Sequence, residues 1–118
     1  MKAQRQRADR RGREAEDRVA EWLAARGWEV LAKRRKTPLG EIDLICREGT
    51  CTVFVEVKWR KSAEGLDLAI DEYRLRRVAA AAESVAHEYA GETGDMRIDV
   101  ILLAPGCQPR HIVNAWMP

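Results

Sequence analysis

The chain has 118 residues, a length typical of one domain, so we expect a single domain over residues 1–118. Its 21 basic and 19 acidic residues leave a formal net charge of only +2, so any affinity for a polyanion must come from local clusters of charge. No apolar run is long enough to span a bilayer, and no apolar secretory segment follows the basic N-terminus. These features predict a cytoplasmic protein without membrane contact.

The predicted elements alternate between helices and strands. Helices are predicted from apolar residues at helical spacing, and strands from short apolar runs bounded by turn residues. In chain order they are a helix at 9–26, strands at 28–32, 40–45 and 53–58, a helix at 67–89, and strands at 97–103 and 112–116. We expect the basic residues 1–8 to form a flexible tail. The order α-β-β-β-α-β-β predicts an α/β fold, a mixed sheet flanked by helices, with a buried central strand at 97–103 and an edge strand at 112–116.

Two of the predicted strands carry ionisable residues inside apolar runs. Asp43 lies in the segment 40–45, and Glu56 and Lys58 lie in the segment 53–58. A carboxylate that leaves water without a partner costs several kcal/mol, so these side chains indicate a functional site. The alternative is a salt bridge across the strands that stiffens a hairpin.

The register of the predicted hairpin decides whether these side chains meet. A turn centred on residues 48 and 49 would place Glu41 opposite Glu56 and make Asp43 a diagonal neighbour of Glu56, about 7–8 Å away at the backbone. Two carboxylates on one face at this spacing can bind one divalent cation, with Lys58 beside them. A slip of one residue would put Asp43 and Glu56 on opposite faces of the sheet.

The cysteines and histidines do not indicate a metal site. Cys46, Cys51 and Cys107 are odd in number and lack a C-x-x-C spacing, so neither a disulfide framework nor a zinc site is predicted. Cys46 and Cys51 would lie opposite each other in the register above, as free thiols. His87 and His111 have no partner at ligand spacing, and we expect structural or surface roles for both.

Glu16 is a charged residue in the apolar pattern of the first predicted helix. If that helix packs across the hairpin, Glu16 can join Asp43 and Glu56 as a further ligand or as a carboxylate that orients a bound water. Alternatively, Glu16 is a boundary residue paired with Arg13 or Arg18. The sequence leaves both interpretations open.

Basic residues gather at the N-terminus and in the block 33–36, just before the strand at 40–45. We expect this block to contact nucleic-acid phosphates, because it adjoins the carboxylates; the alternative is an ordinary basic loop. The residues predicted to bind nucleic acid are Lys33, Arg34, Arg35, Lys36, Arg60, Arg74 and Arg77.

Taken together, the motifs resemble a known family. An acid on the first helix, Gly-Glu-Ile-Asp-Leu-Ile at 40–45, Val-Phe-Val-Glu-Val-Lys-x-Arg at 53–60 and Arg-x-Asp-Val at 97–100 are similar to the YraN-type family of uncharacterised bacterial proteins. That family is assigned to the PD-(D/E)XK nuclease superfamily, which includes Holliday junction resolvase-like endonucleases. The resemblance therefore implies that the mixed sheet flanked by helices is restriction-endonuclease-like. The chain departs from the family pattern at Arg34, where Asn is frequent, and at Arg74, where Lys is usual.

The resemblance assigns roles to individual residues. It implies that Asp43 is the first metal carboxylate, that Glu56 and Lys58 form the E-x-K pair, and that Glu16 is the helix-borne acid of resolvase-like members. Mg²⁺ or Mn²⁺ would be held by Asp43, Glu56 and the backbone carbonyl of Val57, with Glu16 available for a second ion. Lys58 would orient the hydrolytic water or help to deprotonate it. The residues expected to support the site are Glu41, Arg97 and Asp99.

Two functions follow from these expectations. The first is a metal-dependent endonuclease that hydrolyses phosphodiester bonds of DNA, with branched or damaged DNA in repair or recombination as the expected substrate. The second is a non-catalytic nucleic-acid-binding module with a vestigial nuclease site. The choice between DNA and RNA stays open, and the apolar edge near Trp116 is compatible with a homodimer.

Overall fold

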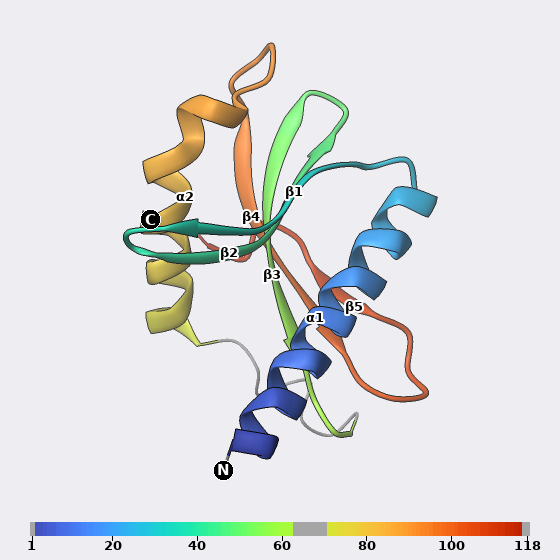
Figure 1. Ribbon diagram of the computed structural model, residues 1–118. Helices are drawn as coiled ribbons and strands as arrows, with labels where there is room; N and C mark the ends of the chain where they lie inside the picture. Colours follow the sequence, from blue (N-terminus) through green and yellow to red (C-terminus); the bar gives the residue numbers. More distant parts are fainter. Residues whose placement is uncertain (1, 63–70, 117–118) are drawn as a thin grey trace.

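The computed structural model describes residues 2–62 and 71–116, with side chains from Arg10 onward. The elements follow the predicted order and confirm the fold class (Figure 1). They are α1 (Lys2–Ala25), β1 (Glu29–Thr37), β2 (Gly40–Glu48), β3 (Cys51–Trp59), α2 (Glu72–Tyr89), β4 (Met96–Leu103) and β5 (Arg110–Ile112). Within the described residues, neither helix contains a stretch long and apolar enough to cross a bilayer.

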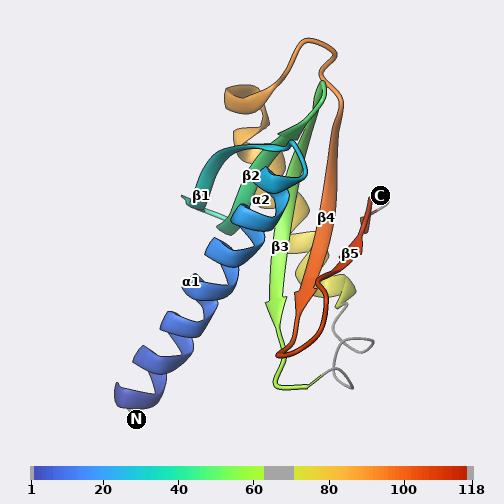
Figure 2. The same cartoon turned by 90° about the vertical axis from the view of Figure 1, so that its right-hand side faces the viewer.

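The five strands form one open sheet in the order β1-β2-β3-β4-β5. Only β3 and β4 are parallel, and α2 connects them, whereas the other neighbours are antiparallel. The two helices cover opposite faces of the sheet (Figures 1 and 2). Strand β4 lies between β3 and β5 and is buried from Ile98 to Leu103, as its continuous apolar run predicts.

Several elements differ in extent from the prediction. The basic block 33–36 is not a loop but part of β1, because the β1–β2 hairpin pairs down to its tip, where Thr37 faces Gly40. The first helix already begins at Lys2, so residues 2–8 are helical, and the flexibility expected of this basic segment stays a prediction. Residues 67–70 of the second predicted helix lie outside the described residues.

The closing strand also differs from its prediction. It is an edge strand, as expected, but it spans Arg110–Ile112 rather than 112–116. Asn114 adopts the left-handed conformation, with φ of 54°, which ends the extended backbone. The polar residues at 110 and 111 concealed the strand in the sequence. Beyond the strand, Ala115 and Trp116 pack against the core, and the Ala115 amide donates to the Ile98 carbonyl at 2.7 Å without continuing the strand.

The β2–β3 hairpin turns one residue later than expected. Its two-residue turn is Gly49-Thr50, and Gly49 has φ of 58°, a conformation that favours glycine. Cys46 therefore faces Val53, so the prediction that Cys46 and Cys51 are opposite is wrong. The error in pairing is two residues, and an even shift keeps every side chain on its predicted face.

A buried carboxylate links β4 to the C-terminal segment. Asp99 is fully buried and accepts hydrogen bonds from Arg97 Nε at 3.0 Å, from Arg97 Nη2 at 3.2 Å and from the backbone amide of Asn114 at 2.9 Å. His111 Nε2 of β5 lies 2.8 Å from the second carboxylate oxygen. These contacts satisfy the charge that burial would otherwise make costly.

The His111 ring connects the same network to the helix on that face. It packs edge-on against Trp22 of α1 and against Trp28, with ring centroids 6.1 and 5.5 Å apart. His111 therefore has a structural role, in agreement with its lack of a partner at ligand spacing.

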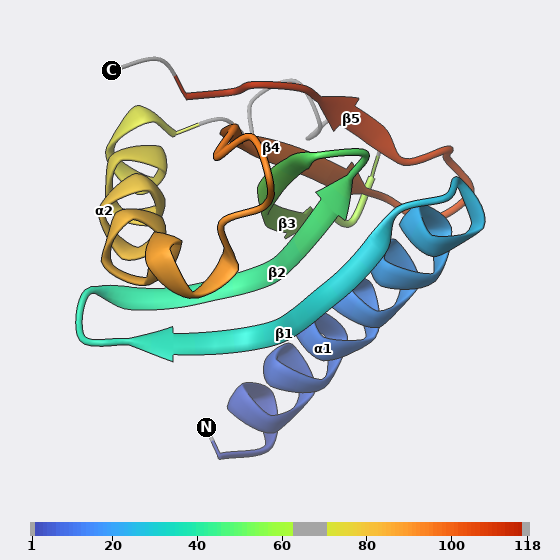
Figure 3. The same ribbon diagram turned by 90° about the horizontal axis from the view of Figure 1, so that it is seen from above.

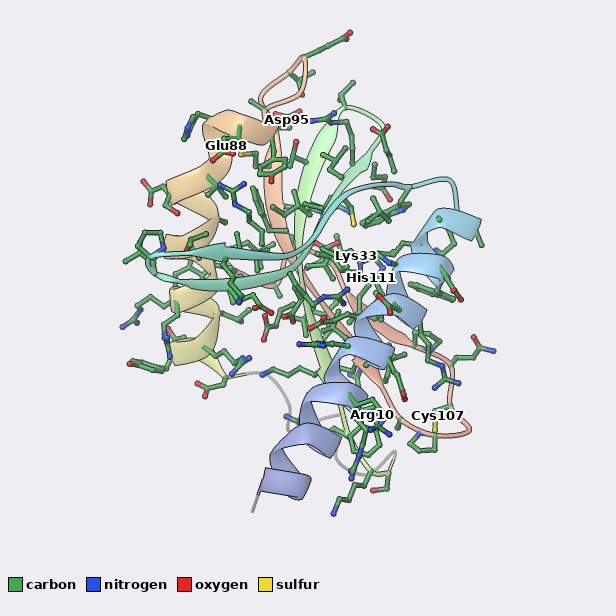
Figure 4. The ribbon with its side chains drawn as sticks, in the orientation of Figure 1. Arg10, Lys33, Glu88, Asp95, Cys107 and His111 are labelled. Carbon is green, nitrogen blue, oxygen red and sulfur yellow. The ribbon has the colours of Figure 1, made fainter. Side chains whose placement is uncertain are left out.

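Replacing Asp99 tests the structural role of this network. Asp99→Asn removes the buried counter-charge of Arg97 and leaves it Glu48, a half-exposed acid 3.3 Å away, so we expect a loss of about 1–3 kcal/mol in the free energy of unfolding. Urea unfolding followed by circular dichroism measures it. The control is Asp95→Asn, an exposed acid just before β4 (Figure 4), which should change stability by less than about 0.5 kcal/mol. Equal effects of the two substitutions would contradict the assigned role.

Candidate metal centre

The candidate site forms where β2 leaves β3. Pairing between these strands runs from the turn to Leu44 opposite Val55. Beyond that pair, the Val57 amide donates to Asp43 Oδ2 at 2.8 Å. The Asp43 side chain thus supplies the acceptor that a β2 carbonyl would supply in a continuing ladder. Because the N–H and C=O of one residue in an extended strand point the same way, the Val57 carbonyl also faces the gap beside Asp43.

A distortion of β1 brings the first helix to the same place. Arg34 has φ of 51°, which is uncommon for a residue other than glycine. Two consecutive β1 side chains consequently reach α1: Lys33 Nζ lies 3.2 Å from Asp17, and Arg34 Nη1 lies 3.1 Å from Glu16. Figure 4 shows Lys33 beside α1. This packing of α1 across the hairpin is the arrangement in which Glu16 can reach Asp43.

Asp43 lies in a cluster of four carboxyl groups, which also contains Glu16, Glu41 and Glu56. Ligand oxygens of Glu16, Glu41 and Asp43 all lie within 4.8 Å of one another. The Glu56 side chain from β3, only 2% exposed, interacts directly with Asp43. Of the two interpretations of Glu16, the pairing with Arg13 or Arg18 is wrong, since Arg34 is its partner.

Burial and the neighbouring negative charges raise the pKa values of two acids in this cluster. Burial, followed by the charge of Glu56, raises the pKa of Asp43 to about 8, so its carboxyl group holds a proton at neutral pH when no cation is bound. Burial also raises the pKa of Glu16, although the hydrogen bond from Arg34 opposes this. Oxygen donors that repel one another fit a hard divalent cation such as Mg²⁺, which prefers carboxylate ligands.

Two cations already lie against Glu56. Arg74 Nε, from the first turn of α2, is 2.6 Å from Glu56 Oε1, and Lys58 Nζ is 3.5 Å from the same oxygen. Burial lowers the pKa of Lys58, and the nearby positive charges of Arg74 and Arg60 lower it further, against the attraction of Glu56. A larger fraction of Lys58 is therefore neutral near pH 7 than of an exposed lysine, and only the neutral amine can accept a proton.

A pocket of about 170 Å³ opens onto the acidic cluster. It lies between the tip of the β1–β2 hairpin and the first half of α2, and Figure 3 shows this tip beside α2. Its walls carry both signs of charge, with acids from β2 and β3 facing two arginines from α2. The lining residues are Leu39, Gly40, Glu41, Asp43, Glu56, Arg74, Arg77, Val78 and Ala81.

The structure distributes the predicted basic residues unevenly. Three members of the 33–36 block hold carboxylates: Lys33 and Arg34 bind α1 as described, and Arg35 lies 2.9 Å from Glu88 of α2. Lys36 is exposed, and among the described residues no ion-pair partner is found for it. Arg74 and Arg77 line the pocket, and Arg60 directly follows β3, close enough to affect Lys58.

Arg97 and Asp99 belong to the separate buried network that contacts β5, rather than to the acidic cluster. Sequence reasoning missed the two arginine–glutamate pairs, Arg34 with Glu16 and Arg74 with Glu56. Each joins residues 18 positions apart on different elements, so no local pattern announces them. One sequence signal was available for the second pair. Asp71 is a helix-capping residue, and its side chain accepts from the amides of Tyr73 and Arg74, so it places Arg74 in the first turn of α2.

Comparison with known proteins identifies the family. Residues 15–103 match the uncharacterised protein family UPF0102. A UPF0102 protein of Erythrobacter litoralis is 64% identical over 114 residues, covering 97% of this chain and 98% of the relative. UPF0102 proteins of Sphingopyxis alaskensis and Caulobacter vibrioides are 55% and 42% identical, over 94% and 89% of this chain and 96% and 85% of theirs. The matches confirm the YraN-type resemblance drawn from the motifs, and the chain belongs to the uncharacterised protein family UPF0102.

Proposed function

We propose that this protein is a metal-dependent endonuclease of the PD-(D/E)XK type that hydrolyses phosphodiester bonds of DNA. The observation that carries the proposal is the meeting of Glu16, Asp43, Glu56 and Lys58, which come from α1, β2 and β3. Burying several acids together costs stability, and a simple ion pair would not need more than one of them. A site that binds a cation explains this cost.

The groups that would hold Mg²⁺ or Mn²⁺ are carboxylates around Asp43 and one backbone oxygen: Asp43, Glu56, Glu16, Glu41 and the Val57 carbonyl. When bound, the ion supplies Lewis acidity toward the phosphodiester and the attacking water. The protein's part is to fix these oxygen donors on a rigid sheet. The Asp43 carboxylate is held by the Val57 amide, so its position is set before any ligand arrives.

Lys58 and two arginines have complementary parts in this proposal. Lys58, with its lowered pKa, orients the attacking water and accepts its proton. Arg74 and Arg77, which line the pocket, are placed for hydrogen bonds to a phosphate group. Their positive charges then oppose the negative charge that develops at phosphorus during the reaction.

Together with the pocket arginines, basic residues at the end of β3 and on α1 make up what we call the basic surface. Arg60 follows the end of β3, and Arg11 of α1 lies over the Trp59 ring at 5.4 Å from its centroid. Arg10 and Arg13 are exposed on the half of α1 away from β1 (Figure 4 labels Arg10). We propose that this surface binds the DNA backbone, and that branched or damaged DNA in repair or recombination is the substrate.

A non-catalytic nucleic-acid-binding module is the second candidate. The observation that favours it is the close Arg74–Glu56 pair, which neutralises Glu56 without any metal. Calorimetric titration with Mn²⁺ separates the candidates, because a module that only binds DNA needs no cation at these carboxylates. Assays of linear, flapped and four-way DNA substrates with Mg²⁺ then identify the substrate.

Separate substitutions of Glu56 and Lys58 test the assigned roles. Glu56→Gln should abolish cleavage and weaken metal binding, whereas Lys58→Ala should slow cleavage by about 10²–10⁴ with metal binding largely retained. Calorimetry and a gel-based cleavage assay measure the two effects. Glu83→Gln, at an exposed position on α2, is the control. Cleavage that persists equally in all three variants would remove this site from the mechanism.

Asp43 should make the stability of the metal-free protein depend on pH. Its folded-state pKa of about 8 exceeds the unfolded value of about 3.9, so its stabilising contribution is full below about pH 4 and is lost as the pH rises toward 8. Asp43→Asn keeps the acceptor for Val57 and removes this loss. At pH 9 the variant should gain stability relative to wild type; even half of this pKa shift is worth roughly 3 kcal/mol.

The measurement is urea unfolding in EDTA between pH 5 and pH 9. Asp95→Asn serves as the matched control, because Asp95 is exposed and precedes β4. If the difference between Asp43→Asn and wild type stays constant across this pH range, the pKa of Asp43 is not raised as assigned.

The basic surface should supply affinity that depends on salt and not on sequence. Replacing Arg60 and Arg77 together by Ala removes two expected phosphate contacts. The slope of log affinity against log salt concentration should therefore become less steep by about 1.8, and by the same amount for DNA duplexes of unrelated sequence. Lys33→Ala is the comparison, since Lys33 is occupied by Asp17 and should change the slope less per charge removed. An unchanged slope in the double variant would exclude these arginines from the interface.

A further inference from the structure

The ion pair between Glu56 and Arg74 competes with the binding of a metal ion by Glu56. Its Oε1 atom contacts Arg74 Nε at 2.6 Å, and its side chain is only 2% exposed, so solvent screens these charges poorly. A divalent cation on this carboxylate would lie within a few ångströms of the guanidinium. The two positive charges therefore compete for one buried carboxylate.

Of the two cations on Glu56, Arg74 is the one that can leave. Lys58 is on the same strand as Glu56, two residues away, and its side chain is 15% exposed. The Arg74 side chain is 55% exposed and extends from the first turn of α2, whose backbone the Asp71 cap holds in place. Rotation of the side chain alone can thus carry its guanidinium from Glu56 into the adjoining pocket, while the helix stays where it is.

We propose that Arg74 is an exchangeable counter-ion that couples metal binding to phosphate binding. Without ligands it pairs with Glu56; when a phosphate enters the pocket, it transfers to that phosphate and releases Glu56 for the cation. This inference rests on the proposed function. Guanidinium groups bind phosphate with two parallel hydrogen bonds, so the phosphate is a suitable second partner. Since coupling between two binding sites is reciprocal, phosphate must tighten metal binding by the same factor that metal tightens phosphate binding.

Calorimetric titration of Ca²⁺, with and without a short DNA duplex, tests the coupling. Ca²⁺ also takes carboxylate oxygens, and gels verify that the DNA stays intact; the heat of Ca²⁺ with DNA alone is subtracted. DNA should lower the Ca²⁺ dissociation constant of the wild type about 5–50-fold, within the usual range of such couplings. In Arg74→Gln the competitor is gone, so Ca²⁺ should bind about 5–50-fold more tightly than to wild type without DNA, and DNA should then change the affinity less than about twofold.

Arg77→Gln is the matched control, because Arg77 lines the same pocket from the same helix while the recorded contact to Glu56 is from Arg74. This variant should bind DNA more weakly and keep the effect of DNA on Ca²⁺ affinity. The inference is overturned if DNA leaves the wild-type Ca²⁺ affinity unchanged, or if Arg74→Gln binds Ca²⁺ no more tightly than wild type. If a variant does not fold, an unchanged wild-type affinity still overturns the inference. Ca²⁺ binding that is equal in all three proteins overturns only this inference, whereas no Ca²⁺ binding in any of them overturns the proposed function as well.

Discussion

The hydrogen bond from the Val57 amide to the Asp43 carboxylate is the interaction on which the site depends. A backbone amide left unpaired where β2 leaves β3 would be costly, and the Asp43 side chain removes that cost. The same bond brings a carboxylate next to Glu56 inside the sheet. The acids that meet there are compensated in three ways. Arg34 pairs with Glu16, Arg74 pairs with Glu56, and the raised pKa of Asp43 lets that residue hold a proton near pH 7. The local end of a strand pair thus accounts for the charge distribution of the site.

Much of the fold could be predicted from the sequence, because the apolar patterns specify it. The order of the elements and the burial of β4 follow from helical spacing and from one continuous apolar run. The ends of helices and strands were harder to predict where the polarity of the side chains does not match the backbone pairing. The 33–36 block was predicted as a loop from its four basic residues, yet it is a strand, because pairing with β2 continues to the hairpin tip. Conversely, the apolar residues after Ile112 suggested a strand that the backbone does not form.

The members of the candidate site could be predicted, whereas their partners could not. Asp43, Glu56 and Lys58 stand out as charges within apolar strands, and their faces survived an error of two residues in the register. Moving the turn by one residue changes the pairing register by two residues, which keeps these side chains on one face. Only an odd change of register would have put Asp43 and Glu56 on opposite faces. The arginines that neutralise Glu16 and Glu56 arrive from β1 and α2, so their positions depend on how whole elements pack.

The central claim is that these carboxylates bind a divalent cation, and anomalous diffraction from crystals grown with Mn²⁺ tests it most directly. The account predicts an anomalous peak within about 2.0–2.4 Å of oxygens of both Asp43 and Glu56, with the Arg74 guanidinium moved away from Glu56. No peak at these carboxylates at millimolar Mn²⁺, with the Arg74–Glu56 pair intact, would contradict the account.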